Sequence, residues 1–344
     1  MAFLPQSTRS AQNLTPGRIL TAEHTERAEI SFALTMRGIR VESVICNLCN
    51  SSEAREVYPS TLPESGKIIG KGAYCCTSAG YGRHFRIVQC LNCGLAYANP
   101  RYASADILQL YQSVEDPLYL EEVEGRRLTF RRHLAELERV TGLGIGQRLL
   151  DVGAYAGVFV EIAREAGWGA EGLEPSRWAV EQGQAMGLPI IEGTLDSASF
   201  PEDSYDALTM WDVIEHMTDP LRELREAWRV LRPGGILAVH TMDRDSLFAR
   251  LMGRRWPWLM EMHIYFFSNR TLKAMLEKGG FEVLKIKPQG RFLRLGYVVT
   301  RVRPYSRLAA TVLEGIINRF GWGQVAIPIN FGDLVTAYAR KPAE

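Results

Sequence analysis

The sequence lacks any long apolar run and any surplus of charge. No stretch of its 344 residues approaches the roughly 18–20 consecutive apolar residues that a membrane-spanning helix needs. Lysine and arginine number 40 against 39 aspartate and glutamate residues, so the net charge of +1 provides no field that would attract nucleic acid. Residues 1–40 also contain no secretory hydrophobic segment. We therefore expect a cytoplasmic protein that binds no nucleic acid.

Cysteine is scarce, yet four of the six cysteines follow one pattern. Cys46 and Cys49 form a C-x-x-C pair, and Cys90 and Cys93 form a second one. Two such pairs offer four thiolates to a tetrahedral zinc ion, and in a reducing compartment a metal site is favoured over disulfides. With four protein ligands the site would be structural. The alternative is four free thiols packed in a core.

A glycine turn follows a predicted buried strand, but it matches neither of the two common phosphate-binding motifs. The segment 148–176 is typical of a strand, a turn with Gly153 and Gly157, a helix, and a second strand ending in Glu174. No G-x-x-x-x-G-K-[ST] occurs anywhere, which excludes a P-loop nucleotidase. The dinucleotide fingerprint G-x-G-x-x-G is missing too, since Tyr155 stands at its middle position. The turn and the helix amides after it still favour a nucleoside cofactor, with Glu174 placed to bind ribose hydroxyls.

The spacing D-x-G-x-x-x-G resembles motif I of the class I S-adenosylmethionine-dependent methyltransferases. A helix, an acidic turn, the strand 205–211, Pro233-Gly-Gly235 and a final strand then follow in the order of the methyltransferase_11/23-type families. The resemblance implies an α/β, Rossmann-like seven-stranded methyltransferase sheet with its last strand antiparallel, beside a small N-terminal zinc-binding module. It also implies S-adenosylmethionine as cofactor, with Zn²⁺ as a structural ion.

The resemblance further implies a set of cofactor-binding residues. Those around the methionine part are Asp151, Gly153, Tyr155 and Gly157. Glu174 would bind the ribose, and Thr194, Leu195 and Asp196 would flank the adenine. Trp211 and Asp212, at the end of the fourth strand, would line the same pocket.

Three residues are candidates for the acceptor side of the reaction. His216, His263 and Tyr265 follow strands or the segment that we expect to cover the site, and any of them could remove a hydroxyl proton. Asp212, Glu215 and His216 also resemble the E-x-x-E-H metal-binding pattern of certain O-methyltransferases, with aspartate in the first place. The same residues occur in metal-free relatives at the start of a helix, so both interpretations stay open.

The chain divides into four predicted parts. A flexible arm spans 1–40, a zinc-ribbon-like module 41–100, a helical linker or cap 101–141, and the methyltransferase domain 142–344. In the linker, Leu128, Leu134, Leu137 and Val140 form one apolar face.

Two insertions interrupt the predicted domain. The insertion 242–263 is predicted to be a substrate lid, and its basic, tryptophan-containing part 245–260 could instead contact a membrane surface. The insertion 288–331 contains a predicted helix at 305–320, whose apolar stripe suits packing on the core or against a second copy in a homodimer.

The predicted function is O- or C-methylation of a small molecule or glycan, such as a sugar or a secondary metabolite. A methyltransferase of a quinone or lipid-linked intermediate is the second candidate. A third, of another class, is a scaffold protein that keeps the fold and binds the cofactor without turnover.

Overall fold

A computed structural model describes residues 39–62 and 72–343. The arm predicted at 1–40 therefore lies almost wholly outside the described residues. Within the described ranges, no helix combines the length and the apolar character needed to cross a membrane.

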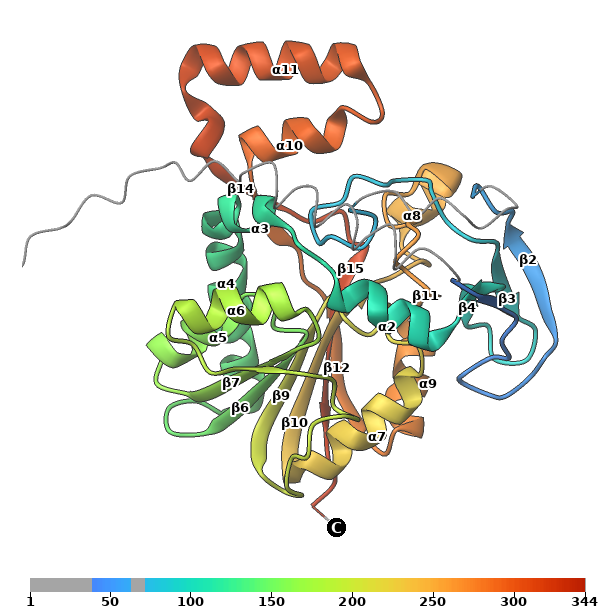
Figure 1. The fold of residues 1–344 in the computed structure, drawn as a ribbon, viewed down its shortest axis with the longest axis vertical. Coiled ribbons are helices and arrows are strands. Elements are labelled where there is room, and N and C mark those ends of the chain that lie inside the picture. The colour runs from blue at the N-terminus through green and yellow to red at the C-terminus, as the bar shows by residue number, and fades with distance from the viewer. Residues whose placement is uncertain (1–38, 63–71, 344) are drawn as a thin grey trace, which may run out of the picture. The chain divides into compact units, whose positions relative to one another are not determined.

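A seven-stranded sheet forms the core of the catalytic part (Figure 1). Its order is β12-β15-β10-β9-β6-β7-β8. Only β15 runs antiparallel to its neighbours β10 and β12, which confirms the predicted fold. The strands are β6 (Arg148–Val152), β7 (Gly169–Glu174), β8 (Ile190–Glu192), β9 (Tyr205–Trp211), β10 (Leu231–Met242), β12 (Glu282–Pro288) and β15 (Leu334–Arg340).

The central strands are parallel and buried, as helices on both faces of such a sheet require. Leu149 and Leu150 of β6 and Leu208 of β9 are completely buried. Helix α5 (Val158–Glu165) packs on β7, and α6 (Arg177–Ala185) packs on β8. Helices α7 (Pro220–Val230) and α9 (Asn269–Lys278) contact one another and the strands β10, β12 and β15. The carboxyl ends of β6, β7 and β9 meet at one edge, where sheets of this kind bind ligands.

The cysteine-containing module is joined to the catalytic part by a shared sheet. Strands β2 (Ala54–Tyr58), β3 (Ile87–Cys90) and β4 (Ala96–Ala98) form a meander, and β11 (Tyr265–Phe266) completes it in the order β11-β4-β3-β2. A second small sheet pairs β1 (Val41–Glu42) with β5 (Arg101–Tyr102). Because β11 follows the first insertion, the module depends on residues far along the chain for its edge.

Side chains between the cysteines also fix the module onto the catalytic part. The Asn47 side-chain amide donates to Asp219 at 2.7 Å, and its oxygen accepts the Leu221 amide at 3.1 Å. Asp219 and Leu221 belong to the first turn of α7, whose amides need capping partners. Lys278 at the end of α9 donates to the Leu48 carbonyl. The first C-x-x-C turn therefore caps one helix and contacts the end of another.

The predicted helical linker consists of α2 (Ser104–Gln112), α3 (Pro117–Glu121) and α4 (Val123–Thr141). The expected apolar face of α4 is only partly correct, since Leu134 and Leu137 are buried but Leu128 is 40% exposed. A different face is turned inward, carrying Gly125, Thr129 and His133. It packs against β13 (Arg291–Arg294), which pairs with β14 (Ala326–Ile329) in the second insertion.

The second insertion is a helical hairpin of α10 (Leu295–Val302) and α11 (Arg307–Phe320). The two helices pack on each other through Val299, Ala310 and Ile317. Of the predicted α11 stripe, Leu308, Val312, Ile316 and Phe320 stay 45–77% exposed and do not pack on the core, while packing against a second copy stays a prediction. The small side chain of Ala310 permits close contact between the two helices. As a result, α10 covers only a narrow part of the apolar stripe of α11.

Candidate functional site

The glycine turn after β6 has the backbone geometry that its sequence predicts. Gly153 adopts a φ of +72°, and a Cβ there would approach Val213 Cγ2 to 2.6 Å. Gly157 precedes α5 with a φ of +82°, and a Cβ would lie 2.8 Å from methyl groups of Ile190 and Leu188. Both positions therefore exclude larger residues. The turn places the first amides of α5 at the carboxyl edge of the sheet.

Tyr155, the departure from the usual motif, forms a wall of the site. Its φ is +51°, and its amide donates to Glu174 Oε2 at 2.9 Å. Its ring lies 4.2 Å from the Tyr119 ring between centroids, and its side chain is buried. Within the described ranges its hydroxyl has no hydrogen-bond partner. The tyrosine thus leaves a free phenol beside the turn.

Two buried carboxyl groups lie at the ends of β6 and β7. Glu174 Oε1 accepts the Ser176 amide at 2.8 Å, and burial raises the pKa of Glu174 to about 7. Asp151 Oδ1 accepts the Thr209 hydroxyl at 2.6 Å, and burial raises its pKa to about 8. Each carboxyl group keeps free lone pairs that can accept hydrogen bonds from a ligand. Such hydrogen bonds would favour the ionised form of the carboxyl group.

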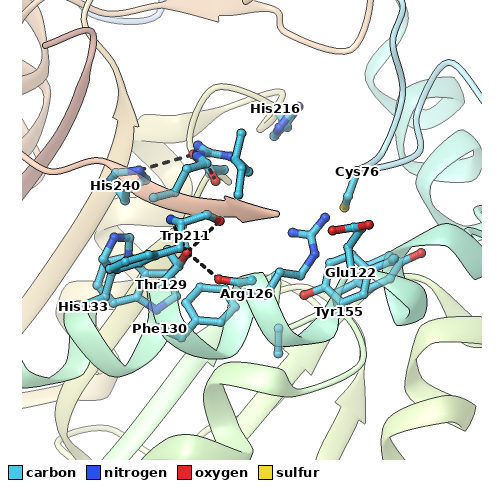
Figure 2. Close-up of a pocket in the computed structure, with 18 of the residues that line it drawn as sticks. Cys76, Glu122, Arg126, Thr129, Phe130, His133, Tyr155, Trp211, His216 and His240 are labelled. Atoms are coloured by element: carbon cyan, nitrogen blue, oxygen red, sulfur yellow. Dashed lines mark hydrogen bonds and ion pairs between the residues drawn. The ribbon is translucent and has the colours of Figure 1, made fainter. Parts of the chain in front are cut away.

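A cavity of about 170 Å³ lies at this edge (Figure 2). Of the predicted cofactor residues it is lined by Asp151, Gly153, Tyr155, Trp211 and Asp212. Glu174, Gly157, Thr194, Leu195 and Asp196 lie beyond its lining. Leu195 is buried, and Asp196 forms an ion pair with Arg222 at 2.5 Å.

The cavity is small for the whole of the predicted cofactor. Its volume falls below the roughly 300 Å³ of ordinary small-molecule pockets. The ring of Tyr155 lines the cavity, while Glu174, which accepts the Tyr155 amide, lies outside the lining.

Sequence reasoning missed the residues that the helical linker contributes to the cavity. Arg126, Thr129, Phe130 and His133 line it from one face of α4, and Tyr119 lines it from α3. Figure 2 shows Arg126 near Glu122 and Tyr155, with His133 beside Trp211. The signal was the spacing i, i+3, i+4, i+7 of these four α4 residues, which places them on one helix face. The apolar leucines of α4 drew attention to a different face.

Arg126 is the cation best placed for an anionic part of a ligand. Its guanidinium carbon lies 3.8 Å from the centroid of the Tyr119 ring. Its Nε is buried and has no hydrogen-bond partner in the part of the chain that the structure describes. A guanidinium with a free donor suits a carboxylate.

The acceptor side of the cavity contains two of the three predicted catalytic residues. His216 and His263 both line it, with ring centroids 4.8 Å apart, and Glu215 lies beside them. Burial lowers the pKa of His216, and burial together with His216 lowers that of His263 to about 3. Both imidazoles are therefore neutral at pH 7, and the strongly lowered pKa makes His263 a weak base.

The structure places Tyr265 away from the cavity, contrary to its prediction as a catalytic residue. It belongs to β11, opposite Tyr97 of β4, and is 1% exposed. Its hydroxyl lies 3.3 Å from Arg101 Nη1 and 3.4 Å from the Thr218 carbonyl oxygen. His263 precedes β11 and lines the cavity, whereas Tyr265 pairs within the module's sheet.

Asp212 is held by a cation from the second insertion. Both of its carboxylate oxygens accept from Arg291 Nη2 at 3.1 Å, and His240 Nε2 lies 3.7 Å away. Burial raises the pKa of Asp212, but Arg291 and the neighbouring imidazoles outweigh it and lower the pKa to about 2. The φ of Asp212 is +57°, an uncommon value that aims the side chain at Arg291.

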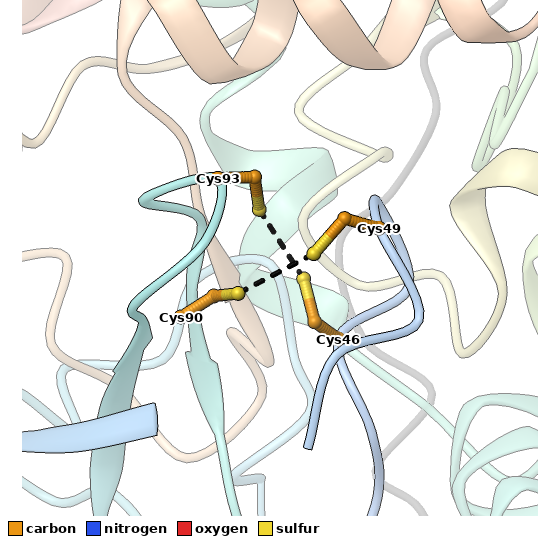
Figure 3. A group of neighbouring side chains, drawn as sticks. All are labelled: Cys46, Cys49, Cys90 and Cys93. Atoms are coloured by element: carbon orange, nitrogen blue, oxygen red, sulfur yellow. Dashed lines mark hydrogen bonds between the residues drawn. The ribbon is translucent and has the colours of Figure 1, made fainter. Parts of the chain in front are cut away.

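The four predicted metal-binding cysteines come together in the module (Figure 3). Their sulfur atoms all lie within 4.8 Å of one another, and none forms a disulfide. Both C-x-x-C turns share one geometry, in which the amide of the residue after the second cysteine donates to the first cysteine's carbonyl. These bonds are Asn50 to Cys46 at 2.8 Å and Gly94 to Cys90 at 3.0 Å. Four sulfurs on two matched turns suit a tetrahedral ion.

Comparison with known proteins agrees with this geometry. Residues 121–286 match a family described as a methyltransferase domain. A probable S-adenosylmethionine-dependent methyltransferase of Mycolicibacterium smegmatis is 30% identical over 45% of this chain and 59% of its own length. A ubiquinone biosynthesis O-methyltransferase of Vibrio cholerae is 34% identical over 32% of this chain and 47% of its own length. The chain thus spans about half the length of these relatives.

Among solved structures, one from Thermotoga maritima is described as an S-adenosylmethionine-dependent methyltransferase, possible histamine N-methyltransferase. It covers 63% of this chain and 93% of its own, with 23% identity and a TM-score of 0.42.

The sheet order and the glycine turn beside the buried Glu174 are those of a Rossmann-like domain, a fold that binds nucleoside cofactors at this edge. The family match over residues 121–286 and the relatives named above support a class I S-adenosylmethionine-dependent methyltransferase domain in this part of the chain.

Proposed function

We propose that the protein transfers a methyl group from S-adenosylmethionine to a small molecule or glycan. The observation that carries this proposal is the juxtaposition of the glycine turn, Arg126 and two neutral histidines around one cavity. The turn and Arg126 belong to the cofactor side, and the histidines belong to the acceptor side. A scaffold protein without turnover would not need two neutral histidines in this cavity.

The residues of this chain would hold the cofactor from both ends. Arg126 binds the carboxylate of the methionine part, beside Asp151, Gly153, Tyr155 and Gly157. Glu174 binds the ribose hydroxyls, and the segment Thr194, Leu195 and Asp196 borders the adenine. When bound, S-adenosylmethionine supplies a methyl group on a sulfonium, which is a good leaving group. The chain contributes alignment and exclusion of water.

An imidazole removes the acceptor's proton if the acceptor is a hydroxyl. The acceptor oxygen forms a bond to the methyl carbon, the carbon–sulfur bond breaks, and its electron pair stays on sulfur. The proton passes to Nε2 of His216 or His263, which are neutral and line the cavity. A carbon acceptor activated by a neighbouring hydroxyl would use the same base.

The four cysteines hold a structural Zn²⁺ in this proposal. The ion would fix the first C-x-x-C turn, and with it the cap that Asn47 provides to α7. With all four positions filled by thiolates, no site remains for substrate.

The experiment that tests the proposed function is titration calorimetry of the full chain with S-adenosylmethionine. We expect saturable binding at one site per chain, and competition by S-adenosylhomocysteine because both share the adenosine and the amino-acid tail. Absence of binding by both compounds would overturn the proposal. Binding without transfer of a labelled methyl group to any small molecule in an extract of the source cells would favour the scaffold.

A lipid-linked or quinone acceptor is the second candidate, and the exposed face of α11 favours it. Leu308, Val312, Ile316 and Phe320 recur every four residues and are all exposed. Residues 288–331 contain six arginines and one glutamate. Arg291 and Arg294 are paired with Asp212 and Glu122, and Arg307 and Arg319 belong to α11 itself. An apolar stripe on a helix that carries arginines is typical of helices that lie on anionic membranes. Tyr305 at the hairpin donates to the Arg255 carbonyl at 3.1 Å, which joins α11 to the segment 245–260.

We expect the double variant Leu308→Glu, Phe320→Glu to bind vesicles of anionic phospholipid at least about 10-fold more weakly than the wild type, because two apolar side chains no longer leave water. Co-sedimentation measures the bound fraction. Ile145→Glu is the matched control, since Ile145 is 84% exposed outside this face. Loss of binding in Leu251→Glu but not in the double variant would assign the contact to 245–260 instead.

A further inference from the structure

Three potential metal ligands meet in the acceptor half of the cavity. Glu215, His216 and His263 each offer a ligand atom, and these atoms all lie within 4.8 Å of one another. All three residues line the cavity. Ligands at about 2.0–2.2 Å from a tetrahedral ion are separated by roughly 3.4 Å, so a small approach of the side chains would complete the set.

Hydrogen bonds fix which nitrogen of each histidine faces the cavity. His216 Nδ1 lies 2.9 Å from the Met262 carbonyl oxygen, and His263 Nδ1 lies 2.7 Å from the Trp258 carbonyl oxygen. The Tyr111 hydroxyl also lies 2.8 Å from His216 Nδ1 and 3.4 Å from the Met262 carbonyl oxygen. A carbonyl oxygen only accepts, so a proton on each Nδ1 satisfies these contacts, with the Tyr111 hydroxyl donating to the Met262 carbonyl. Each Nε2 then keeps a lone pair. This second hydrogen bond is the usual support of a metal-binding imidazole.

Glu215 provides a buried carboxylate with one unused oxygen. Its Oε2 accepts the Thr241 hydroxyl at 2.9 Å, while Oε1 has no hydrogen-bond partner among the described residues. The residue is completely buried. His216 Nε2 lies 4.0 Å from Oε1. An unpaired buried carboxylate oxygen is costly, and a cation between Oε1 and the two imidazoles would offset that cost.

The main chain brings His263 to this place from 47 residues away in the sequence. The amides of Ile264 and Tyr265 both donate to the Glu215 carbonyl, at 2.9 and 3.1 Å. Asp212, the first residue of the D-x-x-E-H pattern, is instead held by Arg291. The pattern in the sequence therefore suggests the wrong first ligand, and the fold supplies His263 in its stead.

We infer that Glu215, His216 and His263 bind a divalent transition-metal ion, Zn²⁺ or one of similar preference. Two imidazoles and one carboxylate leave a position open toward the cavity, as in catalytic rather than structural sites. This step rests on the proposed function: the open position would bind the hydroxyl oxygen of the methyl acceptor. Coordination lowers the pKa of a bound hydroxyl. The imidazole lone pairs would then serve the ion, and the hydroxyl proton would leave to solvent.

The test measures metal content separately from methyl transfer. Full-length protein is equilibrated with Zn²⁺, freed of excess ion, and analysed for zinc per chain. We expect two zinc ions in the wild type, one in the cysteine site and one here, and a single ion in His263→Ala and in Glu215→Gln. Affinity for the second ion should fall more than about 100-fold, since loss of a ligand exceeds the effect of losing its outer support.

Control measurements distinguish loss of the metal site from loss of folding or of cofactor binding. His240→Ala removes another buried histidine of the same cavity that lies outside the trio, and it should retain two ions. Substituting Co²⁺ gives a second readout, since the visible bands of the trio should vanish in His263→Ala while thiolate bands persist. One zinc in both wild type and His263→Ala would overturn the inference. Calorimetry with S-adenosylmethionine, which does not require this ion, would still report on the proposed function.

Discussion

Replacing Glu174 with alanine should weaken the binding of S-adenosylmethionine by at least about 100-fold. Two hydrogen bonds from ribose hydroxyls to a carboxylate are worth about 1.5–3 kcal/mol each. Glu174 also accepts the amides of Tyr155 and Ser176, so its loss releases the glycine turn. Titration calorimetry measures the dissociation constant.

The matched control for this variant lies on the neighbouring strand. Glu192 pairs in register with Glu174 at the end of β8, but its side chain is exposed. Glu192→Ala should bind S-adenosylmethionine as the wild type does. Equal affinity of Glu174→Ala and wild type, with the fold intact by circular dichroism, would remove Glu174 from the cofactor site.

The second large effect is expected from Cys90→Ser, which should lose the structural zinc ion and unfold the module. Apparent binding free energies of structural zinc are about 10–16 kcal/mol. This equals or exceeds the roughly 5–15 kcal/mol by which ordinary domains are stable. Zinc analysis should show one ion fewer per chain, and the melting temperature should fall to that of wild type treated with a strong chelator.

Cys75→Ser is the control for loss of a thiol. Cys75 lies outside the four-sulfur cluster, and its Sγ is 3.5 Å from the Glu115 carbonyl oxygen. Its substitution should leave zinc content and melting temperature unchanged. If Cys90→Ser kept its zinc and its melting temperature, the four thiols would be core residues rather than ligands.

Local patterns predicted the sheet and the turn because these features depend on neighbours in sequence. Gly153 and Gly157 are required where backbone and side chains crowd the turn. The strand predicted at 205–211 has the bounds observed for β9, and most of its side chains are buried, as expected of a strand covered on both faces. The two C-x-x-C pairs likewise led directly to the cluster that the structure shows.

Contacts between distant segments could not be predicted in this way. His263 meets Glu215 because the amides of the next two residues, Ile264 and Tyr265, donate to the Glu215 carbonyl. Asp212 is bound by Arg291 of a hairpin that no local pattern connects to it. Arg126 reaches the cavity from a helix whose apolar face was assigned from leucines alone. The first two depend on tertiary contacts for which the sequence carries no periodic signal, whereas helical spacing groups Arg126 with its neighbours on α4 but does not say what that face meets.

The strand β11 has a consequence for how this gene can change. Residues 265–266 serve as an edge of the module's sheet, while residues 262–263, immediately before them, line the cavity. Exchange of residues 41–100 for an unrelated segment by recombination would leave that edge without its partner and shift the cavity wall with it. The two regions should therefore be inherited together, with compensating substitutions in one when the other varies.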